Sequence, residues 1–297
     1  MEPLVAIVGF LGAGKTTLLK KLISQFTKED WQPYVILNDY ENAQLDVQQL
    51  YDCGDPKMIK ALDGSCICCS GIVELRNFIN NVPKREKGIT FIEANGTSDS
   101  VKLMGFLGVG IEDRFAPPIQ VSVVDLKNWQ KRGIDNELER NQIQVSSLIV
   151  LTHGDQVSKE RVNQIRQDIL HWNASAKILN VEEVQIELLE TLRPIQNEVT
   201  AMEHHKAHWA SCSIPLTKLP NLESIWKLMN GIPSNILRVK GCVQIENEEG
   251  YLFFERTPDG EIYTNTNYSE PSTGAALLCI GPGSSKEMLK AALAAAL

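Results

Sequence analysis

The sequence has no long apolar run. No stretch approaches the roughly 20 residues that a membrane-spanning helix needs, and the alanine-rich end, Leu289 to Leu297, is too short and is typical of a terminal helix. The first residues, Met1-Glu2-Pro3, lead directly into a predicted strand without the pattern of a signal peptide. These absences exclude a membrane-spanning protein and favour a cytoplasmic one.

Basic runs and a disulfide framework are also missing. The chain carries 29 Lys and Arg against 37 Asp and Glu, a formal net charge of −8. This charge argues against a strong general affinity for nucleic acid or for an anionic membrane. Three of the seven cysteines fall within four positions, which does not suit paired disulfides and favours a reduced chain. An apolar content of 43% over 297 residues is that of an ordinary globular protein of one or two domains.

A glycine-rich loop lies near the start of the chain. Residues 9–16 read GFLGAGKT, which is G-x-x-x-x-G-K-[ST], between an apolar strand, Leu4–Val8, and a helical pattern. Backbone amides and the helix dipole would bind phosphate oxygens there, Lys15 would reach the β- and γ-phosphates, and the Thr16 hydroxyl would ligate Mg²⁺. The pattern predicts a nucleoside triphosphate site formed by Gly12, Ala13, Gly14, Lys15, Thr16 and Thr17.

Strand and helix patterns alternate up to about residue 200. The predicted strands are Leu4–Val8, Tyr34–Leu37, Ile59–Leu62, Thr90–Ile92, Ile119–Val124, Leu148–Leu151 and Lys177–Leu179. The predicted helices are Lys15–Phe26, Ile72–Val82, Lys159–His171 and Ile186–Thr191. Alternation of this kind predicts an α/β fold, with a mostly parallel sheet that helices cover on both faces.

The pattern changes after residue 200. Residues 201–212 form a polar linker that contains His204, His205 and His208, for which a solvated surface is the simpler interpretation and metal transfer the alternative. Residues 213–297 then combine a helix at Leu222–Met229 with short strands and turns, which predicts a small α+β domain. We therefore expect domains at residues 1–200 and 213–297.

The second strong motif is a cluster of cysteines. Residues 64–71 read GSCICCSG, and the glycines permit a turn that brings the sulfurs of Cys66, Cys68 and Cys69 together before a helix N-terminus. Three thiolates suit a soft or borderline metal, zinc first, with a fourth position open for transfer. Buried apolar use and a redox dithiol are the alternatives. Burial is the default for Cys53, Cys212, Cys242 and Cys279.

The two motifs together resemble the CobW-type metallochaperone GTPases, relatives of the proteins that load nickel into urease and hydrogenase. The segments that carry the resemblance are GFLGAGKTTLL at residues 9–19, GSCICC at 64–69, IEANG at 92–96 and RVKG at 238–241. It covers most of the chain, and it implies a P-loop GTPase domain followed by a small C-terminal domain.

Acidic residues follow several of the predicted strands. Residues 38–46, NDYENAQLD, resemble the family's N-E-F-G-E-x-x-x-D switch segment, with Asp39 in place of the first Glu and Asp46 retained. One of these two acids could hold Mg²⁺ and the other could serve the metal site, and solvated loop acids are the alternative. Glu93 matches the family's E-x-x-G. It could position Mg²⁺ or the attacking water, while Gly96 would give an amide to the γ-phosphate.

The base-reading motif departs most from the family. Where the family has N-K-x-D, this chain has Thr152-His153-Gly154-Asp155. The Asp155 carboxylate would accept from guanine N1–H and the 2-amino group, whereas adenine presents an acceptor at N1. Thr152 cannot copy the asparagine amide, at a cost of roughly 1–3 kcal/mol, and His153 could stack on the base. Asn173 resembles the last base-contacting loop, with an ordinary helix end as the alternative.

These patterns favour a GTP-hydrolysing metallochaperone with slow intrinsic turnover. We expect GTP, Mg²⁺ and a transition metal such as Zn²⁺ as ligands, a client metalloprotein as partner, and Lys15, Glu93 and Asp39 as catalytic residues. A homo-oligomer is compatible with the sequence. The alternatives are a metal sensor or buffer that barely turns over nucleotide, and an ATP-dependent kinase or ligase, against which Asp155 and the cysteines argue.

Overall fold

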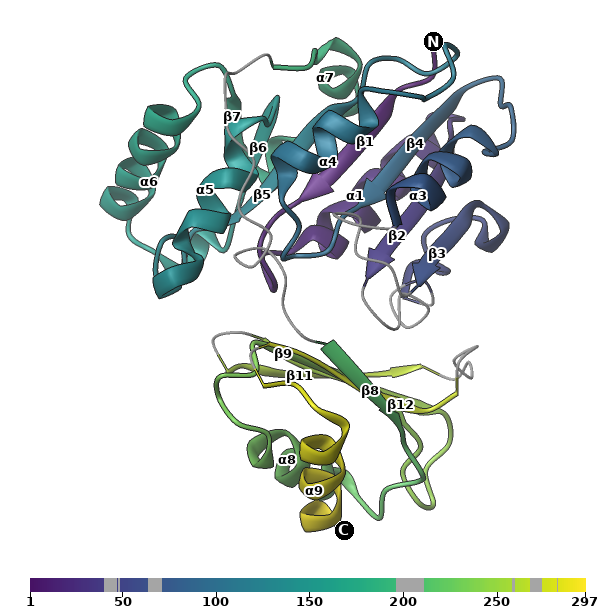
Figure 1. Ribbon diagram of the computed structural model, residues 1–297, viewed down its shortest axis with the longest axis vertical. Helices are drawn as coiled ribbons and strands as arrows, with labels where there is room; N and C mark the ends of the chain where they lie inside the picture. Colours follow the sequence, from purple (N-terminus) through teal and green to yellow (C-terminus); the bar gives the residue numbers. More distant parts are fainter. Residues whose placement is uncertain are drawn as a thin grey trace. The chain divides into compact units, whose positions relative to one another are not determined.

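The computed structural model describes residues 1–39, 47, 49–63, 71–195, 211–257, 260–267, 274–281 and 283–297. The described residues form two compact units, one from residues 1–39 and 50–195 and the other from residues 47 and 49 with the described part of 211–297. Each unit has its own sheet and its own apolar core (Figure 1).

The first unit is built on a seven-stranded parallel sheet, as the alternating pattern predicts. Its order is β3-β2-β4-β1-β5-β6-β7. The strands are β1 (Leu4–Val8), β2 (Gln32–Asp39), β3 (Ile59–Asp63), β4 (Gly88–Glu93), β5 (Ile119–Asp125), β6 (Leu148–Thr152) and β7 (Lys177–Asn180). Because all neighbours are parallel, their carboxyl ends share one edge of the sheet, where ligands bind in folds of this kind.

Helices cover both faces of this sheet. They are α1 (Lys15–Lys28), α3 (Gly71–Asn80), α4 (Ser100–Leu107), α5 (Asn136–Gln144), α6 (Lys159–Trp172) and α7 (Ile186–Thr191). Leu4, Ala6 and Val8 of β1 share a core with α3 and α4. Helix α1 contacts β1, β2 and β4, and it also contacts α7. All five residues of β1 are buried, as expected for a central strand with helices on both sides.

Two of these helices are absent from the sequence-based prediction. Helix α4, SVKLMGFL, has only eight residues and contains Gly105. Helix α5, NELERNQIQ, buries three polar residues, Glu139, Asn141 and Gln142, beside Leu138 and Ile143. Hydrophobic periodicity therefore gives little sign of α5, because hydrogen bonds rather than apolar contacts fill much of its buried face.

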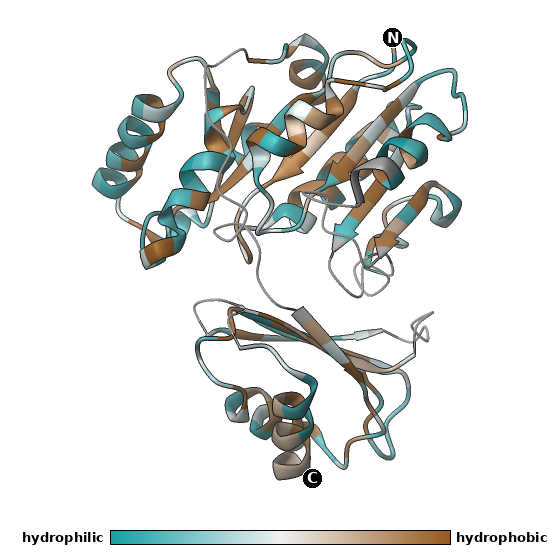
Figure 2. Ribbon diagram, in the orientation of Figure 1, coloured by the Kyte–Doolittle hydropathy of each residue, from teal (hydrophilic) through white to brown (hydrophobic). Residues whose placement is uncertain are grey.

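The second unit contains a five-stranded antiparallel sheet of order β11-β10-β9-β12-β8. Its elements are β8 (Ser211–Pro215), α8 (Leu222–Gly231), β9 (Arg238–Val243), β10 (Tyr251–Arg256), β11 (Ile262–Asn267), β12 (Ala276–Ile280) and α9 (Lys286–Ala296). The α+β prediction for this region is confirmed. Apolar residues gather along the strands of the first sheet, and helices such as α6 carry many polar residues (Figure 2).

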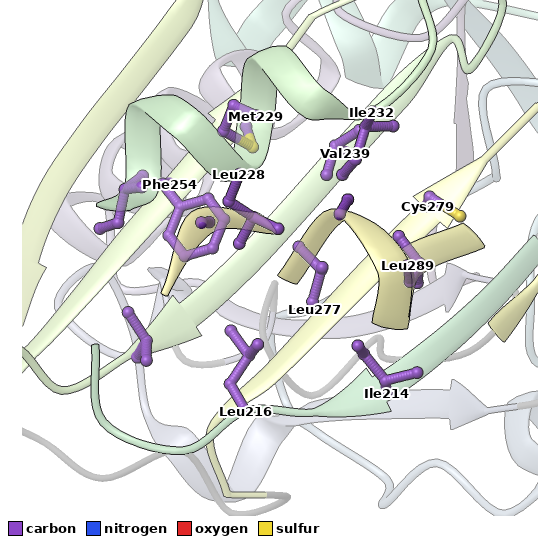
Figure 3. Packing of buried hydrophobic residues seen from close by; sticks show 14 of the residues in the cluster. Ile214, Leu216, Leu228, Met229, Ile232, Val239, Phe254, Leu277, Cys279 and Leu289 are labelled. Carbon is purple, nitrogen blue, oxygen red and sulfur yellow. The ribbon is translucent and has the colours of Figure 1, made fainter. Parts of the chain in front are cut away.

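Helices α8 and α9 pack on one face of the second sheet. Figure 3 shows Leu228 and Met229 of α8 packed with Val239, Phe254 and Leu277 of the strands, and Leu289 of α9 belongs to the same cluster. Gly241 is required beneath Phe254, because a Cβ at residue 241 would lie 2.2 Å from Phe254 Cζ.

One buried cation closes the end of α8. The Arg256 guanidinium donates to four backbone carbonyls, those of Met229, Ile232, Pro233 and Ile236. Burial lowers the pKa of Arg256. The negative end of the α8 dipole and the four carbonyls compensate the charge that would otherwise be costly to bury.

Three of the four scattered cysteines are buried, as expected, and Cys53 departs from the expectation. Cys212, Cys242 and Cys279 are buried and Cys53 is half-buried. Burial raises the pKa of the Cys242 thiol to about 12. No helix among the described residues is both long enough and apolar enough to cross a membrane.

Candidate nucleotide-binding site

The loop between β1 and α1 has the backbone geometry of a phosphate-binding loop. Gly9, Gly12 and Gly14 have φ values of 146°, 77° and 94°, and Gly14 is a left-handed N-cap residue without a side-chain capping hydrogen bond. Gly9 is also crowded, since a Cβ there would lie 2.4 Å from the Val123 carbonyl oxygen. The first amides of α1 are therefore left for an external acceptor, which is the arrangement that binds phosphate.

Lys15 and Thr16 already have defined positions in this loop. The Lys15 side chain is buried and its Nζ donates to the carbonyls of Gly9 at 2.9 Å and Phe10 at 3.3 Å. Thr16 Oγ1 donates to Glu93 Oε1 at 2.9 Å. Glu93 ends β4, which pairs with β1 with Glu93 opposite Ile7. The strand pairing therefore brings the predicted Mg²⁺ hydroxyl and the predicted catalytic acid together. Thr17 lies beside them, exposed in the first turn of α1.

The remaining predicted metal ligands are described only in part. Asp39 is the last residue of β2, at the same edge of the sheet as Glu93, and its backbone alone is described. Asp46, Cys66, Cys68, Cys69 and the three linker histidines, His204, His205 and His208, lie outside the described residues. Strand β3 ends at Asp63, directly before the cysteine motif. Within the described ranges no three His, Cys, Asp or Glu residues gather as a metal cluster.

Gly96 lies directly against the phosphate loop. A Cβ at this position would lie 2.5 Å from Leu11 Cδ2 and 2.7 Å from the Leu11 backbone nitrogen. Only glycine allows the loop after β4 to approach the P-loop backbone this closely. This contact places residue 96 beside the backbone of the glycine-rich loop, and its contact with a γ-phosphate stays a prediction.

Thr152 has a role that the sequence comparison did not indicate. Its hydroxyl donates to the Ala13 carbonyl at 2.9 Å, and to the Val124 carbonyl at 3.2 Å. A Cβ added at residue 14 would lie 3.5 Å from Thr152 Cγ2. The threonine therefore connects the P-loop to the carboxyl ends of β5 and β6. This role does not depend on a contact with the base.

A pocket of about 510 Å³ opens beside Thr152. Asp155, exposed in the short helix η3 (Gly154–Gln156), lines it together with His153. Asn180, Val181 and Glu182, at the end of β7 and the start of η4 (Val181–Glu183), also line the pocket, and the sequence analysis missed them. The sequence did contain a sign of their position, because residues 180–182 directly follow the predicted strand Lys177–Leu179, and residues that follow parallel strands lie at the edge of the sheet where ligands bind. Lys21 of α1 donates to the Val181 carbonyl and so joins this part of the pocket to the phosphate side.

His153 is part of an ion network. Its backbone is left-handed, with φ 56°, and Nδ1 lies 2.8 Å from Asp125 Oδ1. The hydrogen bond to Asp125 is the main cause that raises the pKa of His153. Burial alone would raise the pKa of Asp125, but the hydrogen bonds from His153 and Asn128 and the charges of His153 and Arg132 outweigh burial and lower it.

Arg132 extends this network to the P-loop. Its guanidinium lies 3.4 Å from Asp125 Oδ2 and donates to Glu139 Oε1 at 2.8 Å. It also lies 4.1 Å from the centre of the Phe10 ring, a cation–π contact. The base-side loop and the P-loop are therefore connected by charges as well as by Thr152.

The structure corrects the assignment of Asn173 to the base. Its side chain is 1% exposed, and its amide donates to the carbonyls of Ile143 at 2.6 Å and Ser146 at 2.9 Å. Its oxygen accepts from the Ser175 amide. The asparagine fastens the end of α6 to the end of α5, and the pocket wall comes from residues 180–182 instead.

These features define a P-loop nucleotide-binding protein. They are a parallel sheet with a glycine-rich loop after its central strand, Lys15 and Thr16 at the head of α1, and an acid at the end of the adjacent strand. Residues 3–180 match the CobW/HypB/UreG nucleotide-binding domain, and the chain belongs to this family.

Three curated relatives carry related names. The chain is 27% identical over 195 residues to zinc-regulated GTPase metalloprotein activator 1 of Schizosaccharomyces pombe, covering 60% of this chain and 45% of that protein. The protein of the same name from Dictyostelium discoideum is 25% identical over 64% of this chain and 48% of its own length. The zinc chaperone YjiA of Escherichia coli is 24% identical, over 86% of each chain. The chain thus spans about half the length of the first two relatives.

Solved structures with a similar fold include Zn(II)-bound YjiA GTPase from E. coli, with a TM-score of 0.44 and 16% identity over 99% of both chains. HypB from Helicobacter pylori in complex with nickel has a TM-score of 0.40 and 16% identity, covering 64% of this chain and 82% of that one.

Proposed function

We propose that the protein is a cytoplasmic GTPase that couples its nucleotide state to the binding of a transition metal, zinc first, and to delivery of that metal to a client protein. The strand order carries the proposal. Because β1, β4, β2 and β3 are neighbours, the P-loop, Glu93, Asp39 and the chain leading into the cysteine motif follow one another along a single edge of the sheet. The names of the relatives, zinc-regulated GTPase activators and a zinc chaperone, support the same function.

The residues present suit GTP hydrolysis assisted by Mg²⁺. Thr16 Oγ1 and Glu93 Oε1, 2.9 Å apart, are a hydroxyl and a carboxylate oxygen, the hard ligands that Mg²⁺ prefers. These two residues would hold the ion, with Asp39 as a further acid, and the bound ion would neutralise charge on the phosphates. Lys15 would exchange its carbonyl contacts for phosphate oxygens, and Glu93 would orient the water that attacks in line.

Metal handling would follow from nucleotide state through the loops at this edge. Contacts of GTP and Mg²⁺ with the segment 38–46 and with the loop after Glu93 would change the arrangement of the cysteine motif or of the surface that faces the client. The metal is the cargo in this scheme, held by Cys66, Cys68 and Cys69, with Asp46 as a further ligand of the metal site.

Base selectivity has its own test. We assign Asp155 to the guanine N1–H and 2-amino group, and residues 180–182 to the lining of the pocket that receives the base. Asp155→Asn replaces an acceptor by a donor and should lower GTP affinity by at least tenfold while improving affinity for xanthosine triphosphate, whose base has an oxygen at that position. Equal GTP and ATP affinities in the wild type would remove Asp155 from this role.

The central experiment measures metal and turnover together. Protein purified without oxygen should bind about one zinc per chain, and Cys66/Cys68/Cys69→Ser should abolish that binding while GTP affinity remains. Cys53→Ser, a half-buried cysteine outside the motif, is the matched control and should bind zinc normally. GTP turnover should respond to zinc in the wild type and not in the triple variant. Metal binding without any turnover would favour a sensor or buffer, and zinc binding that survives the triple variant would refute the metallochaperone proposal.

A further inference from the structure

The loop after β4 has a tightly determined backbone. The Asn95 carbonyl accepts from the Ser98 amide at 3.0 Å, and Asn95 Oδ1 accepts from the amide and the hydroxyl of Thr97. In a trans peptide the N–H points opposite to the preceding C=O. The Gly96 amide must therefore point away from the Ser98 side of the turn, and Gly96 itself packs against the P-loop at Leu11.

Helix α5 holds the next peptide of this loop. Gln142 Nε2 donates to the Gly96 carbonyl at 3.0 Å and to the Ser98 carbonyl at 3.3 Å. One side-chain amide thus fixes two carbonyls of the loop. With the carbonyls on both sides of residue 96 bound, the Gly96 amide has one available direction.

Gln142 is itself fixed from the sheet. Its side chain is 2% exposed, and its backbone carbonyl accepts from Gln120 Nε2 at 2.6 Å and Ser146 Oγ at 2.9 Å, and from the Ser122 hydroxyl. Gln120 and Ser122 belong to β5, which pairs with β1. A continuous chain of buried hydrogen bonds therefore runs from the strand next to the P-loop, through Gln142, to Gly96.

We propose that Gln142 is a positioning residue that sets the direction of the Gly96 amide and thereby lets this loop distinguish a nucleoside triphosphate from a diphosphate. The proposal rests on the function proposed above. It requires that Gln142 influence the terminal phosphate more than the rest of the nucleotide, because its Nε2 holds the Gly96 carbonyl and Gly96 packs against the P-loop at Leu11. A merely structural glutamine would affect both nucleotides equally.

The test compares GDP with the non-hydrolysable β,γ-imido analogue of GTP. Gln142→Leu removes the amide at similar volume and should raise the Kd of the analogue about tenfold, with less than a twofold change for GDP, and should lower kcat for GTP. Asn173→Leu is the matched control. It removes a buried side-chain amide that fastens the end of α5 through the carbonyls of Ile143 and Ser146 but makes no bond to the loop after β4, so its ratio of the two Kd values should stay as in the wild type.

A second variant keeps the test valid if Gln142→Leu folds poorly. Gln142→Glu places a carboxylate against two carbonyl oxygens, so it should lose discrimination at pH 8 and recover it towards pH 5.5, where the protonated acid can donate to Gly96. Equal losses for GDP and the analogue, or an unchanged ratio in both variants, would overturn the role of Gln142. A wild-type protein that binds no guanine nucleotide would instead overturn the proposed function.

Discussion

Replacing Asp125 by asparagine tests the ion network beside the base pocket. The carboxylate is 4% exposed and accepts from four groups. The donors are the Lys127 amide at 3.0 Å, Asn128 Nδ2 at 2.8 Å, His153 Nδ1 at 2.8 Å and Arg132 Nη2 at 3.4 Å. Asparagine keeps one acceptor oxygen and turns an NH₂ group toward donors at the other position.

The size of the effect follows from these contacts. A buried hydrogen bond to a charged group contributes about 1.5–3 kcal/mol, and an orphaned donor adds to the loss. Arg132 keeps Glu139 as a partner at 2.8 Å, which limits the penalty of an unpaired buried charge. We therefore expect Asp125→Asn to lower the free energy of unfolding of the first unit by about 3 kcal/mol, equivalent to a fall in Tm of about 6–12 °C for a domain of this size.

The same pair gives the wild type a pH dependence with a definite sign. The raised pKa of His153 means that its contribution is complete below the unfolded pKa of about 6.5 and is lost as pH rises through the folded pKa. The lowered pKa of Asp125 means that its contribution is present above about 3.8 and is lost as pH falls through the folded pKa. Since the His153 side chain is 35% exposed, solvent screening reduces its share to about 1 kcal/mol.

Urea denaturation at pH 5.5 and pH 8.5 measures both effects. From pH 5.5 to pH 8.5, the free energy of unfolding of the wild type should fall more than that of Asp125→Asn. A double-mutant cycle of Asp125→Asn with His153→Gln should give a coupling energy that is smaller at pH 8.5 than at pH 5.5. The reasoning is refuted if Asp125→Asn costs less than about 1 kcal/mol, or if the coupling energy is the same at both pH values.

Three further substitutions test close contacts. Thr152→Val removes the hydroxyl that holds the P-loop, and should cost about 1–2 kcal/mol of stability in thermal unfolding while weakening GDP binding. Gly96→Ala forces a Cβ to 2.7 Å from the Leu11 nitrogen, so it should destabilise the first unit by about 1–3 kcal/mol and weaken the GTP analogue by at least tenfold in calorimetric titration. Gly241→Ala forces a Cβ to 2.2 Å from the Phe254 ring, and should lower the Tm of the second unit, with partial recovery when Phe254→Leu is added.

Each of these substitutions has an outcome that would contradict its reasoning. An unchanged GDP affinity in Thr152→Val would mean that the hydroxyl does not shape the P-loop. Wild-type binding by Gly96→Ala would mean that the two loops separate at little cost. Failure of Phe254→Leu to restore any stability would show that Gly241 is needed for its backbone and not for the space above it.

The strands and the phosphate loop were predictable because their signals are local. An apolar run such as Leu4–Val8 is a strand in almost any context where glycine and a helical pattern follow it, and the G-x-x-x-x-G-K-[ST] spacing fixes which amides converge. Helix α5 was not predictable in this way, because Asn141 and Gln142 are buried by long-range hydrogen bonds to residues 96–100. Such partners are adjacent only after the sheet has formed.

The site residues divide in the same way. Glu93 was predicted from the end of a strand and lies against Thr16, because strand order brings β1 and β4 together. The sequence analysis placed Asn173 at the base because the local sequence resembles a base-contacting loop. In the structure its amide donates to two backbone carbonyls that are far away in sequence. Thr152 was interpreted by what it lacks relative to asparagine, whereas its hydroxyl supports the Ala13 carbonyl.

The hydrogen bonds from Arg256 to four backbone carbonyls affect the order in which the second unit folds during synthesis. During synthesis, α8 and the turn after it leave the ribosome before Arg256 does, so the end of this helix cannot be closed while only that part of the chain has emerged. The first strand, β8, waits still longer, because its sheet partner is β12, which is synthesised after every other strand described in this unit. The sheet therefore cannot close before β12 has left the ribosome, and a ribosome stalled before that point would expose an unpaired β8 to chaperones and proteases.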